Sequence, residues 1–149
     1  MVYLMTELPL KLKQLVDDFQ LLTDKNERMD MLLFYAEDFV EVPEEIATRP
    51  FSKDHRVPAC ESEAYVWPQL NDDGTLSFYF AVENPQGVSA KAMAAILTET
   101  IAGSTPEEIA KLEPDVVYEL FGRNMSMGKS AGLTSMVNVV KGYAIKSMQ

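Results

Sequence analysis

Apolar side chains recur at helical spacing in the N-terminal part of the chain. The first run consists of Leu12, Leu15, Val16, Phe19 and Leu22. The second run consists of Met29, Leu32, Leu33, Ala36, Phe39 and Val40. Thr23 or Asp24, between the two runs, is suited to cap the second helix because its side-chain oxygen can accept a backbone N–H. This spacing predicts two consecutive helices that form a helical hairpin.

Two stretches after residue 60 alternate between their faces as β-strands do. In the first, Tyr65 and Trp67 share one face, and Pro68 indicates that the strand lies at a sheet edge or ends there. In the second, one face carries Leu76, Phe78, Phe80 and Val82. The Asn-Asp-Asp-Gly sequence between them is a hairpin-turn signal, and strands joined this way are antiparallel. The preceding region, residues 42–59, is broken by prolines and is expected to be irregular.

The remainder of the chain returns to helical spacing. Ser89 is expected to cap one helix that Gly103 ends, and Thr105 or Ser104 to cap the next. The last helix has an apolar stripe of Leu133, Met136, Val137, Val140 and Ala144. The order of elements predicts an α+β fold in one domain, residues 1–149: a helical hairpin, a small antiparallel β-sheet, and C-terminal helices packed on that sheet.

Composition narrows the class of protein. The chain has 149 residues and a formal net charge of -10, which argues against a nucleic-acid partner because such partners select basic surfaces. No stretch is apolar for the ~20 residues that span a bilayer, and the N-terminus lacks the layout of a signal peptide. One cysteine and one histidine cannot form an internal disulfide or a structural zinc site. We expect a reduced, cytoplasmic protein without a membrane partner.

Cys60, the single cysteine, permits two interpretations. A free cysteine is usually a small buried hydrophobe, and that is the simpler reading. Cys60, however, lies where a proline-broken loop enters a strand, a place that often presents functional side chains. The basic residues that precede it in this acidic chain are Arg49, Lys53, His55 and Arg56. Nearby positive charge favours the thiolate, which is the nucleophile, although Glu61 and Glu63 oppose that effect.

The residues that are absent limit what a reactive Cys60 can do. Without a second cysteine, dithiol chemistry is excluded. A cysteine hydrolase requires a base, and His55 is the only histidine that could supply one. A single thiolate can still accept a group and pass it on.

The sequence VPACESEAYVW, residues 57–67, resembles the core motif of the SufE family of sulfur-acceptor proteins. Val57, Cys60 and Ser62 match the motif Val-x-Gly-Cys-x-Ser, and the aromatic strand follows in step. The order of the helical hairpin, the VPEEI and RPF segments, the β-hairpin and the late GKSAGL segment is also similar. The resemblance covers about Leu8 to Ala144 and implies a SufE/NifU-like fold, including a third strand that the periodicity does not reveal.

Four positions depart from the family pattern. Ala59 stands where glycine is usual before the cysteine, and Glu61 stands where glutamine is common after it. In the late loop, Lys129 replaces a frequent arginine and Ala131 replaces a polar residue. These departures affect the expected geometry of partner docking, but they leave the sulfur in place.

The resemblance implies a mechanism. A pyridoxal-phosphate cysteine desulfurase of the SufS type would hold sulfur as a persulfide, and Cys60 would accept it for an iron–sulfur scaffold. The chain itself would need no cofactor or metal and would have no turnover of its own. Arg56 and Lys129 would stabilise the thiolate or contact the desulfurase, and His55 would do either or neither. Ser62 would hydrogen-bond within the loop or simply stand at the start of the strand. The alternatives are a desulfurase regulator that carries no sulfur and, more remotely, a hydrolase that uses His55.

Overall fold

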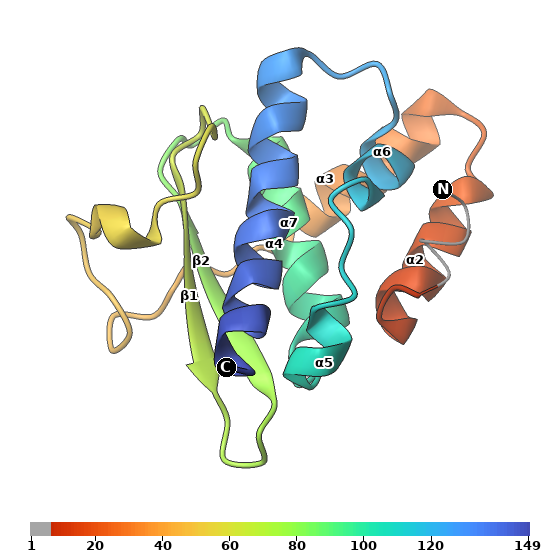
Figure 1. Ribbon diagram of the computed structural model, residues 1–149. Coiled ribbons are helices and arrows are strands. Elements are labelled where there is room, and N and C mark those ends of the chain that lie inside the picture. Colours follow the sequence, from red (N-terminus) through yellow and green to blue (C-terminus); the bar gives the residue numbers. More distant parts are fainter. Residues whose placement is uncertain (1–6) are drawn as a thin grey trace.

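The computed structural model describes residues 7–149 and has an α+β fold (Figure 1). In chain order its elements are α2 (Leu10–Gln20), α3 (Lys25–Glu37), the 3-10 turn η1 (Lys53–His55), β1 (Ala64–Leu70), β2 (Leu76–Val82), α4 (Val88–Ile101), α5 (Pro106–Ile109), α6 (Val116–Phe121) and α7 (Met127–Ser147). The predicted α+β class and its order of helices, hairpin and helices are confirmed. The signal-peptide prediction rests partly on residues 1–6, which lie outside the described residues.

The two predicted N-terminal helices are α2 and α3, and both pack on α4. Asp24 caps α3, because its carboxylate accepts the backbone N–H of Asn26 at 2.8 Å. The predicted apolar stripe of α3 is only partly correct. Leu32 is buried as predicted, and Tyr35, which the predicted stripe left out, is buried with it. The predicted members Met29, Leu33 and Val40 are exposed. Apolar residues stand on more than one face of α3, so the sequence pattern alone does not select the face that meets α4.

The β-hairpin is antiparallel, with Ala64 opposite Val82 and Leu70 opposite Leu76. Strand β1 continues through Pro68, which pairs with Phe78. Proline is tolerated there because β1 has no second strand neighbour among the described residues, as the edge prediction required. The sheet that residues 7–149 form has two strands, so the implied third strand is not part of it.

A loop covers the outer face of the hairpin. The backbone N–H of Val42 donates to the carbonyl of Phe80 at 2.8 Å, on the edge of β2 away from β1. Val42 also packs with the outward-facing residues Tyr65, Trp67 and Ala81. Arg49 closes this cover through ion pairs with two glutamates, Glu41 and Glu83. The irregular, proline-broken region thus forms the second layer over the sheet.

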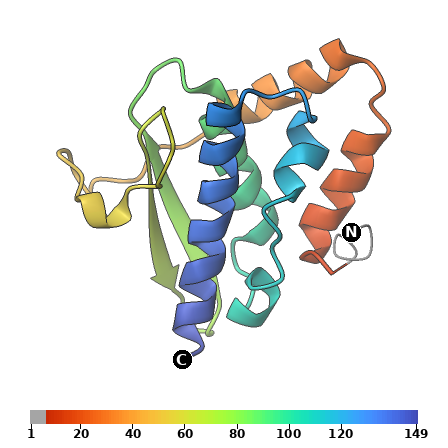
Figure 2. The same cartoon turned by 45° about the horizontal axis from the view of Figure 1, so that its top comes forward.

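The inner face of the hairpin is covered by α4 and α7, which lie side by side (Figures 1 and 2). Helix α4 packs against β2, and α7 packs against β1. All the residues of the predicted α7 stripe are buried. Both helices begin at the end of the sheet where residues 58–63 lead into β1 (Figure 1). No helix within residues 7–149 combines the length and apolarity needed to cross a membrane.

The predicted cap of α4 is wrong by two residues. Helix α4 begins at Val88, with Gly87 at the cap position, so Ser89 lies inside its first turn. The turn formed by residues 84–87 leads directly into the helix, because the N–H of Gly87 bonds the carbonyl of Asn84 at 2.9 Å. No side chain of the described residues caps α4. Its first N–H groups therefore lack a side-chain cap at the end that faces Cys60.

Candidate functional site

Cys60 lies in a short loop whose ends are tied together. The N–H of Val57 bonds the carbonyl of Ala64 at 2.8 Å and closes the base of the loop. Within it, the N–H of Glu63 bonds the carbonyl of Cys60 at 3.2 Å. We call residues 58–63 the Cys60 loop. It presents the sulfur at the entrance to β1, where the sequence predicted a functional side chain.

The backbone of the Cys60 loop is strained on both sides of the cysteine. Ala59 has φ of 61° and Glu63 has φ of 52°, both in the left-handed region. That conformation costs a non-glycine residue about 1–2 kcal/mol. The value for Ala59 explains why glycine is usual before the cysteine in the resembling motif, since glycine adopts this φ without penalty.

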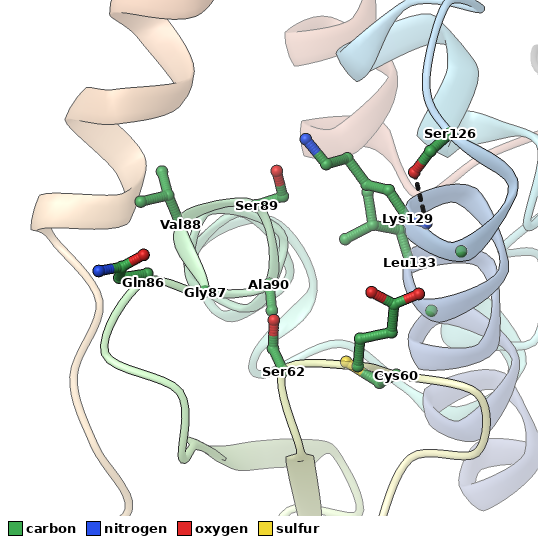
Figure 3. Close-up of a pocket in the computed structure, with 13 residues that line it drawn as sticks. Cys60, Ser62, Gln86, Gly87, Val88, Ser89, Ala90, Ser126, Lys129 and Leu133 are labelled. Atoms are coloured by element: carbon green, nitrogen blue, oxygen red, sulfur yellow. Dashed lines mark hydrogen bonds between the residues drawn. The ribbon is translucent and has the colours of Figure 1, made fainter.

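The Cys60 thiol is sheltered, because only 8% of the residue is exposed. It faces a hollow of about 230 Å³ between the starts of α4 and α7 (Figure 3). We call this space the helix-side hollow. Its lining includes Ser62 from the loop, Ser89 and Ala90 from α4, and Lys129 and Leu133 from α7. Four of these five residues come from parts of the chain distant from Cys60 in sequence.

A second depression lies on the other side of the Cys60 loop. This outer hollow measures about 470 Å³ and is lined by Lys53, Arg56 and the backbone of the loop. Cys60 and Glu61 line both hollows. The loop is therefore a partition, with the sulfur at the boundary between a hollow flanked by helix starts and one flanked by basic side chains.

The predicted site residues separate into three groups. Ser62 and Lys129 share the helix-side hollow with Cys60, and Arg56 lines the outer hollow. His55, by contrast, is absent from the described lining of both hollows. The structure places the first three residues around hollows that Cys60 also lines, and it places His55 at neither.

His55 instead fastens turn η1 to strand β1. Its Nδ1 lies 3.0 Å from the carbonyl oxygen of Val66 and 3.3 Å from the hydroxyl of Tyr143. Its ring stacks on Trp67, with centroids 5.4 Å apart. Burial raises the pKa of the Tyr143 phenol, and the nearby Asp54 raises it further, so the phenol stays protonated. His55 is thus engaged in packing and is not oriented as a base for Cys60.

Two helix starts flank the helix-side hollow, and the Glu61 carboxylate also lines it. The N-terminal turn of a helix carries unpaired N–H groups and the positive end of its dipole. In α7, Ser126 accepts the N–H of Lys129 at 3.2 Å, which leaves other first-turn groups near the hollow (Figure 3). Among residues 7–149 no group of three or more His, Cys, Asp or Glu side chains is arranged to hold a metal ion. The hollow thus combines two helix starts and Lys129 with the opposing negative charge of Glu61.

Glycines that the sequence reasoning did not single out shape this site. A Cβ on Gly132 would lie 3.1 Å from Cα of Cys60, and one on Gly87 would lie 2.8 Å from Oγ of Ser62. A Cβ on Gly128 would collide with the Glu61 carboxylate. Gly128 and Gly132 are four residues apart and hence on one face of α7, where glycine is unfavourable for helix formation. That spacing was a signal in the sequence, but it did not identify the neighbour.

Comparison with protein families gives one match over most of the chain. Residues 13–144 match the SufE family, described as an Fe-S metabolism associated domain. An uncharacterised SufE-like protein of Synechocystis is 32% identical over 125 residues, which cover 83% of this chain and 72% of that protein. A cysteine desulfuration protein SufE of Plasmodium vivax is 25% identical, covering 93% of this chain and 54% of that protein.

Longer relatives and a solved structure are also similar. The SufE-like protein 1 of Arabidopsis thaliana, a chloroplast and mitochondrial protein, is 25% identical over 93% of this chain. The chain spans only 36% of the length of that relative. The solution structure of a hypothetical protein from Thermus thermophilus superposes with a TM-score of 0.71, at 24% identity, over 95% of this chain and 98% of the other. At that identity the superposition concerns the fold alone.

Proposed function

The chain belongs to the SufE family, and from this premise we propose that it carries sulfur on Cys60. Family membership supports a role in iron–sulfur metabolism and sulfur transfer. The proposed donor is the persulfide of a pyridoxal-phosphate cysteine desulfurase, and the proposed recipient is a scaffold that assembles iron–sulfur clusters. The observation that carries the proposal is the position of the single cysteine, sheltered on a strained loop between two hollows.

The proposed transfer is a thiol–persulfide exchange. The Cys60 thiolate attacks the terminal sulfur of the desulfurase persulfide, and a new S–S bond forms at its Sγ. The S–S bond within the desulfurase persulfide breaks, and that cysteine leaves as a thiolate. One sulfur atom moves between two cysteines, so the step needs no external oxidant or reductant.

The helix-side hollow supports the carrying role. A water molecule occupies about 30 Å³ in the liquid, so a hollow of about 230 Å³ has room for one additional sulfur on Cys60. The helix starts that flank it favour the anionic form of a persulfide, against the effect of the Glu61 carboxylate. The same enclosure keeps bulky thiols away, which matters because a persulfide is readily reduced by them. A thiolate of this kind also requires reducing surroundings, so a cytoplasmic location is part of the proposal.

Partner contact is proposed for the basic residues beside the sulfur. Arg56 reaches the outer hollow and Lys129 the helix-side hollow, so each is near the path of an approaching persulfide. We assign to docking at these residues the stimulation of the desulfurase. The hydrolase alternative lacks support, because His55 is hydrogen-bonded to β1 and stacked on Trp67.

The experiment is intact-mass spectrometry after incubation with a cysteine desulfurase and free cysteine. We expect the chain to gain one sulfur atom, reversibly with a reductant, and the Cys60→Ser variant to gain none. Desulfurase turnover is measured in parallel with both proteins. If Cys60→Ser stimulates turnover fully and neither protein gains sulfur, the chain is a regulator and the carrier proposal is wrong.

A further inference from the structure

The contact between Gly132 and the Cys60 loop is tighter than an added side chain ordinarily allows. A Cβ on Gly132 would lie 3.1 Å from Cα of Cys60, 3.3 Å from the carbonyl oxygen of Ala59 and 3.5 Å from Cβ of Cys60. Two of these atoms belong to the backbone, so no side-chain rotation relieves the contact. Any atom added to Gly132 must move either α7 or the Cys60 loop.

Helix α7 is the part that cannot move. Its residues next to Gly132 in the core, Leu133, Met136 and Val137, are buried together with Val140 and Ala144. The Cys60 loop has far less to hold it. Pro58, Ala59 and Glu61 are exposed, and the backbone is left-handed at Ala59 and Glu63. The loop therefore yields first when the contact becomes too tight.

We propose that Gly132 is a positioning residue that sets the depth of the Cys60 loop. Without a Cβ, it lets the loop seat the sulfur in the helix-side hollow. A methyl group at this position pushes the seated loop outward by a few tenths of an ångström and thereby shifts its equilibrium toward states in which the thiol is more exposed. The inference rests on the proposed function for its purpose, since seating protects a persulfide, but the displacement itself is independent of sulfur transfer.

The test compares Gly132→Ala with Gly142→Ala on the same helix. A Cβ on Gly142 would meet no atom of the described residues within 4 Å, and both changes replace glycine by a better helix former. The rate of Cys60 alkylation by iodoacetamide is followed by intact mass at several urea concentrations below the unfolding transition. Global stability is measured separately by urea denaturation and circular dichroism.

We expect Gly132→Ala to raise the alkylation rate about tenfold, since overpacking shifts a local equilibrium by roughly that factor. The rate should depend only weakly on urea, because local opening exposes little surface compared with unfolding. Gly142→Ala should leave the rate unchanged. Gly87→Ala approaches the loop from α4, where a Cβ would lie 2.8 Å from Oγ of Ser62, and should also raise the rate.

Three results would overturn the inference. The first is an unchanged alkylation rate in a folded Gly132→Ala protein. The second is an increase that rises with urea as steeply as global unfolding does. The third is a Gly132→Ala protein that does not fold, since the contact would then maintain the whole domain and not the depth of the loop.

A second arm separates this inference from the proposed function. Wild type and Gly132→Ala are loaded with sulfur by a desulfurase and then exposed to an external thiol. We expect the variant to lose its sulfur faster. If wild type takes up no sulfur at all, the proposed function fails, while the alkylation rates still decide whether Gly132 positions the loop.

Discussion

The Cys60 loop and helix α7 meet at Gly132, yet they differ in how much of each is buried in the core. Helix α7 extends for 21 residues and buries a continuous apolar stripe. The Cys60 loop buries little besides Cys60 itself and includes two non-glycine residues with left-handed φ. Regions with few buried contacts open locally at a small fraction of the global unfolding free energy. The comparison teaches that the sulfur is placed on the part of the molecule that can move while the core stays folded.

The largest expected effect on stability comes from a substitution in the buried stripe of α7. Met136 is fully buried in α7, so Met136→Ala should lower the free energy of unfolding by about 2–5 kcal/mol through lost burial and a cavity. Urea denaturation measures this change. Asn138→Ala, at an exposed position of the same helix, is the matched control and should change stability by less than about 0.5 kcal/mol. If the Met136→Ala protein is as stable as wild type, the buried stripe of α7 does not hold this helix in the core, and the comparison with the Cys60 loop fails.

An intermediate effect is expected at the junction between turn η1 and the sheet. His55→Ala removes a hydrogen bond to Val66 and a stacked contact with Trp67, together worth about 1–2 kcal/mol of unfolding free energy. Because His55 is directed at the sheet, the variant should still accept sulfur at the wild-type rate once folded. Lys53→Ala, in the same turn, is the control for stability. A folded His55→Ala protein that no longer accepts sulfur would give His55 a chemical role.

The smallest expected effect comes from a substitution within the Cys60 loop. Ala59→Gly relieves the left-handed strain but makes the unfolded chain more flexible, so we expect a gain in stability of at most about 1 kcal/mol. Because the seated loop is the strained state, alkylation of Cys60 should slow by a few-fold, opposite to the effect of Gly132→Ala. Faster alkylation of Ala59→Gly would mean that the strain at residue 59 is not what loosens the loop.

The sequence predicted those elements of the fold in which buried and exposed positions alternate regularly along a single helix or strand. The α7 stripe and the alternation at the start of β2 are of this kind. Strand β1 is not, because its first four residues are buried on both faces of the sheet. The start of α4 was missed because residues 84–87 form a turn that continues into the helix, and no capping side chain marks that join.

For the candidate site, the sequence indicated which residue types could carry chemistry, but not which residues pack around them. Residue type and loop position made Cys60 a candidate but left open that it is a small buried hydrophobe, and the family resemblance favoured the functional interpretation. His55 was a candidate by type alone and faces the sheet. Gly132 and Gly87 could not be assigned a role, since their function depends on which backbone lies against them. The left-handed φ of Ala59 agrees with the motif, in which glycine is usual at that position.

The most direct test of the central claim is single-turnover sulfur transfer. A cysteine desulfurase is first loaded with persulfide, freed of excess cysteine, and mixed with an equal amount of this chain. Persulfides are then trapped by alkylation, and the peptide that contains Cys60 is weighed. The account predicts one additional sulfur on that peptide and a matching loss from the desulfurase. If the sulfur stays on the desulfurase while its steady-state turnover is still accelerated by this chain, Cys60 is not a sulfur carrier.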